Sequence, residues 1–168
     1  IQENAGDIYA EAKDINEARA AKEEEFEDLN SWKYYNGEQF VENIEEVKGL
    51  LNNVSCELSV NEEDGKYLCV FTHNVQSPYI ATSSSPTPYG PFDEMRIAYV
   101  CPEKLCDHMY IYNAKAHPHL SKEGELLVSY NINTSNFSEN IQYGRTYGPR
   151  FIKLRKESEA KWRKFKLS

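Results

Sequence analysis

The sequence lacks the features that would point to nucleic acid or a membrane as a partner. Its 168 residues include 19 Lys and Arg against 27 Asp and Glu, a formal net charge of −8, and a negative balance argues against binding a polyanion. No uninterrupted apolar run is long enough to cross a bilayer, and no signal peptide is recognisable after Ile1. The length is still sufficient for one domain with a real core.

Motifs of several enzyme classes are also missing. There is no Gly-x-Ser-x-Gly elbow, no phosphate-binding P-loop and no His-Glu-x-x-His pair, so serine-hydrolase, nucleotide and zinc-protease chemistry lack their usual markers. The four cysteines do not show the Cys-x-x-Cys spacing of a structural zinc site. We therefore expect neither a metal nor a cofactor.

The cysteines leave the redox compartment open. Cys101 and Cys106 flank a short PEKL stretch that a small disulfide loop could close, and Cys56 and Cys69 lie on candidate strands on either side of NEEDG. Disulfides would indicate an oxidising compartment, and on this basis we predict a secreted, extracellular or periplasmic protein. Four buried free thiols are an equal alternative.

Composition divides the chain into three parts. Residues 1–30 are highly charged, and the spacing of their apolar residues favours a helical or extended segment. Residues 31–155 hold short runs rich in branched and aromatic residues, separated by turn signals such as Asp64-Gly65 and Glu123-Gly124. Within them, VENIEEVKGLL (41–51) fits one short helix. Residues 156–168 form a basic tail that we expect to be a solvated terminal element.

This pattern predicts an all-β fold of antiparallel hairpins, and periodicity alone leaves a sandwich, a barrel or propeller blades open. The 12 tyrosines and two tryptophans point weakly to glycans, because aromatic faces stack on sugar rings. For any single tyrosine, ordinary sheet packing remains the simpler interpretation.

An ordered series of motifs favours the propeller: NSWKYYNGEQF, VSCELSVNEEDGKYLCVFT, SPYIATSSSPTPYGPF, YNAKAHPHLSKEGELLVSYNINT and YGPRFIKL. Over residues 28–155 this series resembles the C-terminal part of β-propeller domain families of unknown function (4185 and 5005). These are similar to the five-bladed glycoside hydrolases (family 43) that include arabinanases and xylosidases. The resemblance implies partial β-propeller blades and a glycan-active protein.

The strand count supplies only two to three blades, whereas closure of a propeller needs about four. We therefore expect the second half of a five-bladed propeller, whose partner is an upstream half outside this sequence. Its sheets should be arranged radially, whereas a sandwich would pack two sheets over one common core.

The candidate site residues lie on otherwise apolar strands. Glu57 is a candidate general acid, because partial burial raises a carboxyl pKa; a structural bond to an amide or arginine is the alternative. His117, held extended by Pro118, is a candidate proton donor or sugar ligand, or else a histidine that locks a turn. His119 should point away from it.

Candidate sugar-binding residues follow on the next strand. Ser129, Asn131 and Asn133 share one side of SYNINT, and neutral amides and hydroxyls suit sugar hydroxyls, although they also satisfy strand ends. Arg150 could pair with Glu57 or bind a carboxylated sugar. We predict that Glu57, His117, Asn131 and Arg150 converge on one polar cavity, in either a glycoside hydrolase or a non-catalytic glycan- or protein-binding module.

Overall fold

The computed structural model describes residues 13–15, 18–19, 27–74, 77–103, 106, 108–158 and 161–164. Within these ranges the chain is mostly β-strand, with one short α-helix, α1 (Phe137–Gln142). Single 3-10 turns lie at Leu29–Ser31, Ile44–Glu46 and Pro118–Leu120.

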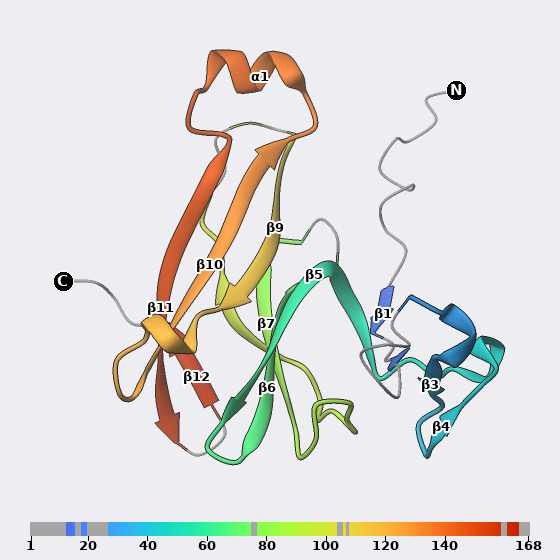
Figure 1. Cartoon of the computed structure of the whole chain (residues 1–168). Helices are drawn as coiled ribbons and strands as arrows, with labels where there is room; N and C mark the ends of the chain where they lie inside the picture. The colour runs from blue at the N-terminus through green and yellow to red at the C-terminus, as the bar shows by residue number, and fades with distance from the viewer. Residues whose placement is uncertain are drawn as a thin grey trace.

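Two large antiparallel sheets are each built from four strands that follow one another in chain order (Figure 1). The first holds β5 (Leu51–Glu63), β6 (Lys66–His73), β7 (Tyr79–Ser85) and β8 (Arg96–Val100), with β1 (Lys13–Ile15) added to the edge of β5. The second holds β9 (Met109–Ala116), β10 (Glu125–Thr134), β11 (Gly148–Ser158) and β12 (Lys161–Lys164). A small third sheet contains β2 (Ala18–Arg19), β3 (Lys33–Tyr35) and β4 (Phe40–Val41).

The turn signals of the sequence close the hairpins as expected. Asp64 and Gly65 join β5 to β6 with φ angles of 51° and 74°, the left-handed pair that a tight hairpin turn needs. Gly124, between β9 and β10, has a φ of 72°. Both hairpins are therefore determined by local sequence.

The two large sheets pack face to face over one hydrophobic core. Alternate residues of β10, from Leu126 to Ile132, are buried, and the core also takes Leu68 and Val70 from β6 and Ile80 from β7. Each fully buried aliphatic side chain contributes about 1.5–3 kcal/mol relative to exposure. A shared core of this kind occurs both in a sandwich and between neighbouring propeller blades.

A second apolar cluster distinguishes these two arrangements. Cys69, Phe71 and Ala81 are fully buried on the opposite face of the first sheet, together with Val54. A two-layered sandwich has one core between its sheets, whereas the sheet of a propeller blade packs on both faces. Two successive four-stranded meanders with burial on both faces of one of them confirm the expected all-β, partial-propeller class. The number of five blades stays a prediction.

The helix expected at residues 41–51 is wrong, and the N-terminal segment takes the extended alternative at the residues described before 27. Lys13–Ile15 and Ala18–Arg19 are strands, while the remainder of residues 1–26 lies outside the described residues. Residues 41–51 hold only the 3-10 turn at Ile44–Glu46 between two strands. In both segments strand pairing with neighbours overrides the helical spacing of apolar residues.

The expected basic tail does not begin at residue 156. β11 extends to Ser158, and β12 pairs with it, Trp162 lying opposite Lys156. Residues 165–168 lie outside the described part of the chain. The second sheet therefore continues into the segment that we expected to be a solvated terminus.

Of the two alternatives for the cysteines, the structure has thiols rather than disulfides at Cys56, Cys69, Cys101 and Cys106, of which Cys69 and Cys101 are buried. Strands β5 and β6 do lie side by side, but their register places Val60, not Cys56, opposite Cys69. Burial raises the pKa of the Cys69 thiol to about 12, so this thiol is not a reactive nucleophile.

Candidate functional site

The outer face of β9, β10 and β11 combines tyrosines with small neutral side chains. Because residues directly opposite in antiparallel strands share a face, pairing places Tyr110 beside Asn133, Tyr112 beside Asn131, and both Lys115 and Phe151 beside Ser129. We call this surface the tyrosine face; it consists of Tyr110, Tyr112, Lys115, Ser129, Asn131, Asn133 and Phe151.

The three β10 residues predicted to share one side do so. Ser129, Asn131 and Asn133 are half-exposed, and they alternate with buried residues of the core. Among the described residues, the Asn131 side chain has no hydrogen-bond partner. Its amide can therefore donate to and accept from a ligand.

Two tyrosines that the sequence reasoning missed lie beside these amides. The rings of Tyr110 and Tyr112 are 5.5 Å apart between centroids, and burial raises the pKa of Tyr112, with further contributions from Tyr147, Tyr110 and Glu57. The alternation Tyr-x-Tyr in MYIYN was the available signal, because it places both rings on one side of a strand. The two rings are tilted by 42°, and half-exposed aromatic rings offer a surface for a sugar ring.

Glu57 reaches this area from the neighbouring sheet. The β5–β6 register shifts between Val54 and Leu58, and the half-buried Glu57 in this irregular stretch interacts electrostatically with Tyr112. No described residue forms a hydrogen bond or ion pair with the Glu57 carboxylate.

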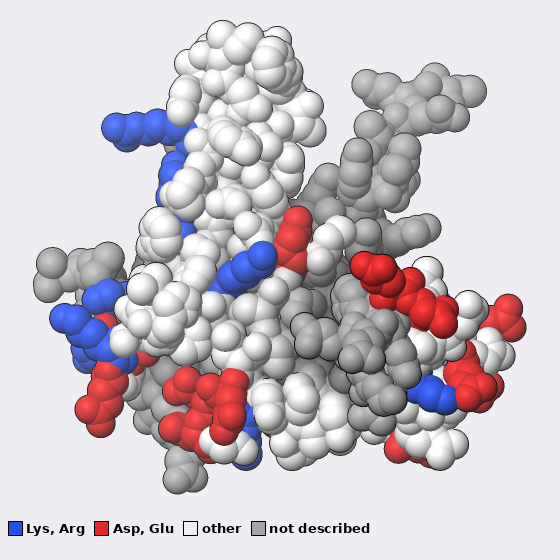
Figure 2. Space-filling model, viewed as in Figure 1, with Lys and Arg blue, Asp and Glu red and all other residues white. Residues whose placement is uncertain are grey.

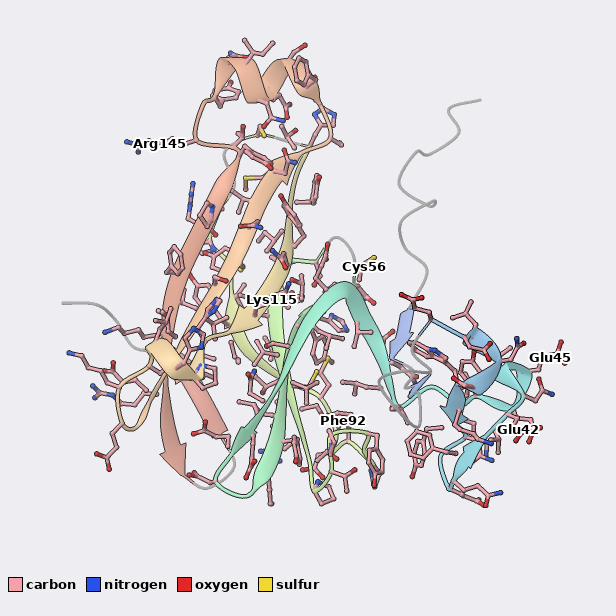
Figure 3. All side chains as sticks on the ribbon, viewed as in Figure 1. Glu42, Glu45, Cys56, Phe92, Lys115 and Arg145 are labelled. Carbon is pink, nitrogen blue, oxygen red and sulfur yellow. The ribbon has the colours of Figure 1, made fainter. Side chains whose placement is uncertain are left out.

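β5 and β9 approach each other without sharing a strand ladder. The amide of Ala116 in β9 donates to the hydroxyl of Ser59 in β5 at 2.8 Å. In Figure 3, Cys56 on β5 and Lys115 on β9 mark the region where the two strands come close. This approach is what brings Glu57 to Tyr112.

His117 has the arrangement of a turn-locking histidine. Its Nε2 lies 2.7 Å from the hydroxyl of Ser129, and its backbone amide donates to Leu127 at 2.8 Å. The side chain therefore lies at the end of the tyrosine face nearest the β9–β10 turn.

The expectation that His119 points away from His117 is wrong. The two rings lie 6.1 Å apart between centroids, because Pro118–Leu120 form a 3-10 turn rather than an extended segment.

Arg150 does not join these residues. It lies opposite the buried Tyr130 on β10, so it faces the core side of the sheet. There its Nε is 3.9 Å from Glu103 Oε1, and the Tyr130 hydroxyl donates to the same carboxylate oxygen at 2.6 Å. The predicted convergence is therefore wrong for Arg150, as is its pairing with Glu57.

A polar network fixes the far end of the face. The Oδ1 atom of Asn133 accepts hydrogen bonds from Asn140 in α1 at 3.0 Å and from the backbone amide of Thr134 at 2.8 Å. The Thr146 hydroxyl donates to Asn140 Oδ1 at 2.7 Å. Asn133 thus supports the loop between β10 and β11 as well as facing the tyrosines.

Glu139 of α1 holds the same loop against the chain that precedes β9. Hydrogen bonds from Thr134, His108 and Cys106 lower the pKa of its carboxyl group to about 2, and its Oε1 lies 2.8 Å from His108 Nδ1. The polar side chains of α1 therefore face the protein, while Phe137 and Ile141 are 76% and 73% exposed.

Charge is distributed unevenly over the molecule. Figure 2 shows the surface over α1 as uncharged, with basic residues, Arg145 among them, along the edge beside it, and acidic residues gathered over the lower part of the view. In the described part of the chain, no three His, Cys, Asp or Glu residues are placed to hold a metal ion. None of the helices described there is long and apolar enough to span a membrane.

Comparisons place the chain among proteins of similar fold. The family of a domain of unknown function (DUF5005) matches residues 4–162, and no curated protein matches. A proposed hydrolase from Bacteroides ovatus is 24% identical with a TM-score of 0.61, over 82% of this chain and 38% of that one. The likeness shows a shared fold, and the chain spans about two fifths of that protein's length.

Two structures of the GH43 protein BlXynB from Bacillus licheniformis are more distant. They are 13% and 14% identical, with TM-scores of 0.42 and 0.43. The similarity covers 78% and 79% of this chain and 26% and 27% of theirs.

Proposed function

The chain belongs to the DUF5005 family of domains of unknown function, and for this member we propose glycan binding on the tyrosine face as part of a glycoside-hydrolase-like protein. The observation that carries the proposal is the pair of adjacent, tilted rings of Tyr110 and Tyr112. Beside them lie the Glu57 carboxylate and the Asn131 amide, which has no hydrogen-bond partner among the described residues. Aromatic rings supply stacking surface for sugar rings, and the amide supplies a donor and an acceptor without charge.

Glu57 is the residue we propose as general acid. Glycoside hydrolysis uses two carboxyl groups, about 6.5–9.5 Å apart in inverting enzymes. The other carboxylate on this face, Glu125, is six residues along β10 from Asn131, or about 20 Å, and it is ion-paired with Lys153. The second catalytic carboxylate would therefore come from outside the described residues.

This arrangement is consistent with a site shared with an upstream half of a propeller. That half would pack on the side of the first sheet that carries the second apolar cluster. Secretion to an extracellular or periplasmic space, where polymeric glycans are found, belongs to the same proposal. His117 would act on the glycan indirectly, at the end of the tyrosine face, through its contact with the Ser129 hydroxyl.

Substitution of Glu57 tests catalysis separately from folding. In the full-length protein, Glu57→Gln should abolish glycan hydrolysis while leaving the melting temperature and glycan affinity unchanged, because no described partner of the carboxylate is lost. Turnover is measured by reducing-sugar release and stability by calorimetry.

Glu103→Gln is the matched control. It weakens the bond to Tyr130, and should lower stability by about 1–3 kcal/mol with turnover per folded molecule retained. Glycan binding with no hydrolysis in either protein would instead favour the non-catalytic binding module. A loss of stability in Glu57→Gln would make Glu57 a structural carboxylate.

A further inference from the structure

The tyrosine face has the shape of a strip rather than a pocket. Its central strand presents the small residues Ser129, Asn131 and Asn133, and the flanking strands present the larger Tyr112 and Phe151. Phe151 is 58% exposed. A ligand on this face would rest on an open surface with larger side chains on both sides.

The strip is longer than one sugar ring. Ser129 and Asn133 are four residues apart on one strand, which is about 13 Å. From Tyr112 to Phe151 the face spans two strand spacings, about 10 Å. Polar side chains stand at every second residue of β10 along this length: Asn131 has no partner among the described residues, whereas Ser129 contacts His117 and Asn133 accepts from Asn140 and Thr134.

The strip carries little charge. The strand pairs Tyr110–Asn133 and Tyr112–Asn131 are neutral, Lys115 lies at one end, and Glu57 borders Tyr112. An acidic glycan laid along Ser129–Asn133 would meet one lysine on a molecule whose formal net charge is −8. The cations of Lys153 and Arg155 lie farther along the same side and pair with Glu125. Among the described residues of the strip, no arginine is placed to recognise a carboxylated sugar.

From this geometry we infer that the tyrosine face binds several consecutive units of an uncharged polysaccharide laid along β10. The inference rests on the proposed function and names its substrate class. A further sheet of the same protein, as ring closure of a propeller would place, could cover this face instead. The polar side chains at alternate positions of β10 favour a hydrated ligand over an apolar sheet.

Titration with sugars of increasing length tests the inference. Calorimetry of the 168-residue chain would use xylose, arabinose and their oligomers of two to six units, the neutral polymers xylan and arabinan, and polygalacturonate as an acidic polymer. The dissociation constant should fall at least tenfold between two and five units, and should not change between 50 and 500 mM salt.

Tyr110→Ala and Tyr112→Ala should each weaken binding of the longest oligomer about tenfold and binding of the monosaccharide much less. Tyr79→Ala is the control, because Tyr79 is an exposed tyrosine (39%) that lies on β7, outside the tyrosine face.

Three results would overturn the inference. Equal affinity for one and five units would mean a single-sugar site, and tighter, salt-sensitive binding of polygalacturonate would mean an acidic substrate; both would leave glycan binding intact. No binding to any glycan, with the tyrosine variants lowering only the melting temperature, would reject the proposed function and assign the face to sheet packing.

Discussion

At the scale of single residues, hydrogen bonding distinguishes polar side chains that stabilise the fold from polar side chains that are available to a ligand. Glu103, Glu139 and His117 each have a close partner, whereas Glu57 and Asn131 have none among the described side chains. A structural role for a polar side chain would show such partners, because an unpaired polar group withdrawn from water costs free energy. The unpartnered pair is therefore where a ligand can supply the missing bonds.

Glu139 should make stability depend on acid pH. Its folded-state pKa of about 2 lies below the ordinary glutamate pKa of 4.5, so its contribution to stability is complete above pH 4.5 and is lost as the pH falls toward 2. The melting temperature of the native chain should therefore drop more steeply between these pH values than that of Glu139→Gln.

Glu62→Gln is the control for this measurement, because Glu62 is exposed on β5. If the melting temperatures of the native chain and of Glu139→Gln fall equally between pH 5 and pH 2, the hydrogen bonds of Glu139 with Thr134 and His108 do not stabilise the fold as assigned.

At the scale of elements, the hairpins could be predicted because their signals are local. Asp64-Gly65 and Glu123-Gly124 identify turns by residue type, and the alternation in ELLVSYNINT identifies one buried and one half-exposed face. The same alternation in RFIKL also indicates the side that Arg150 faces. Alternate residues of a strand lie on one side, so Arg150 lies on the side of the core residues Ile152 and Leu154. The side that Arg150 faces could therefore have been predicted.

The approach of Glu57 to Tyr112 could not be predicted in this way. It depends on how β5 crosses β9 in another sheet, which no local pattern encodes. The short helix expected at residues 41–51 failed for a related reason, since contacts with segments distant in the sequence outweigh a few apolar residues at helical spacing.

The bond between His117 and Ser129 should stabilise the β9–β10 hairpin. Removing either partner breaks a contact of 2.7 Å, so His117→Ala and Ser129→Ala should each cost about 0.5–1.5 kcal/mol. The double variant should cost less than the sum, because the two residues share one interaction. Urea denaturation of the four proteins measures this coupling.

If the double variant loses as much free energy of unfolding as the two single variants together, the contact between His117 and Ser129 contributes nothing to stability. His119→Ala serves as the matched control, because it changes a neighbouring ring without touching Ser129.

At the scale of the whole molecule, the helix between β10 and β11 presents its apolar side chains outward. Phe137 and Ile141, four residues apart on one helix, lie on the same face and are exposed, and Tyr147 of the same loop is 69% exposed. Exposed apolar clusters of this kind mark contact surfaces or promote association.

We expect the chain to bind a hydrophobic dye through this cluster. The double substitution Phe137→Ser with Ile141→Ser should lower dye fluorescence and self-association in the ultracentrifuge with the melting temperature nearly unchanged, because neither side chain is buried. Leu120→Ser, at an isolated residue that is 63% exposed, is the control and should have little effect. A dye signal that persists in the double variant would locate the apolar surface elsewhere, such as the outer side of the first sheet.

Blades that meet without a common strand ladder can be exchanged between proteins as units. β5 and β9 belong to different sheets, and the amide of Ala116 meets a side-chain hydroxyl, that of Ser59, rather than a strand backbone. A grafted β9–β12 meander would therefore need complementary side chains along this line, but no matching strand register. Recombination at the β8–β9 junction should be tolerated more readily than replacement of a single strand within either sheet.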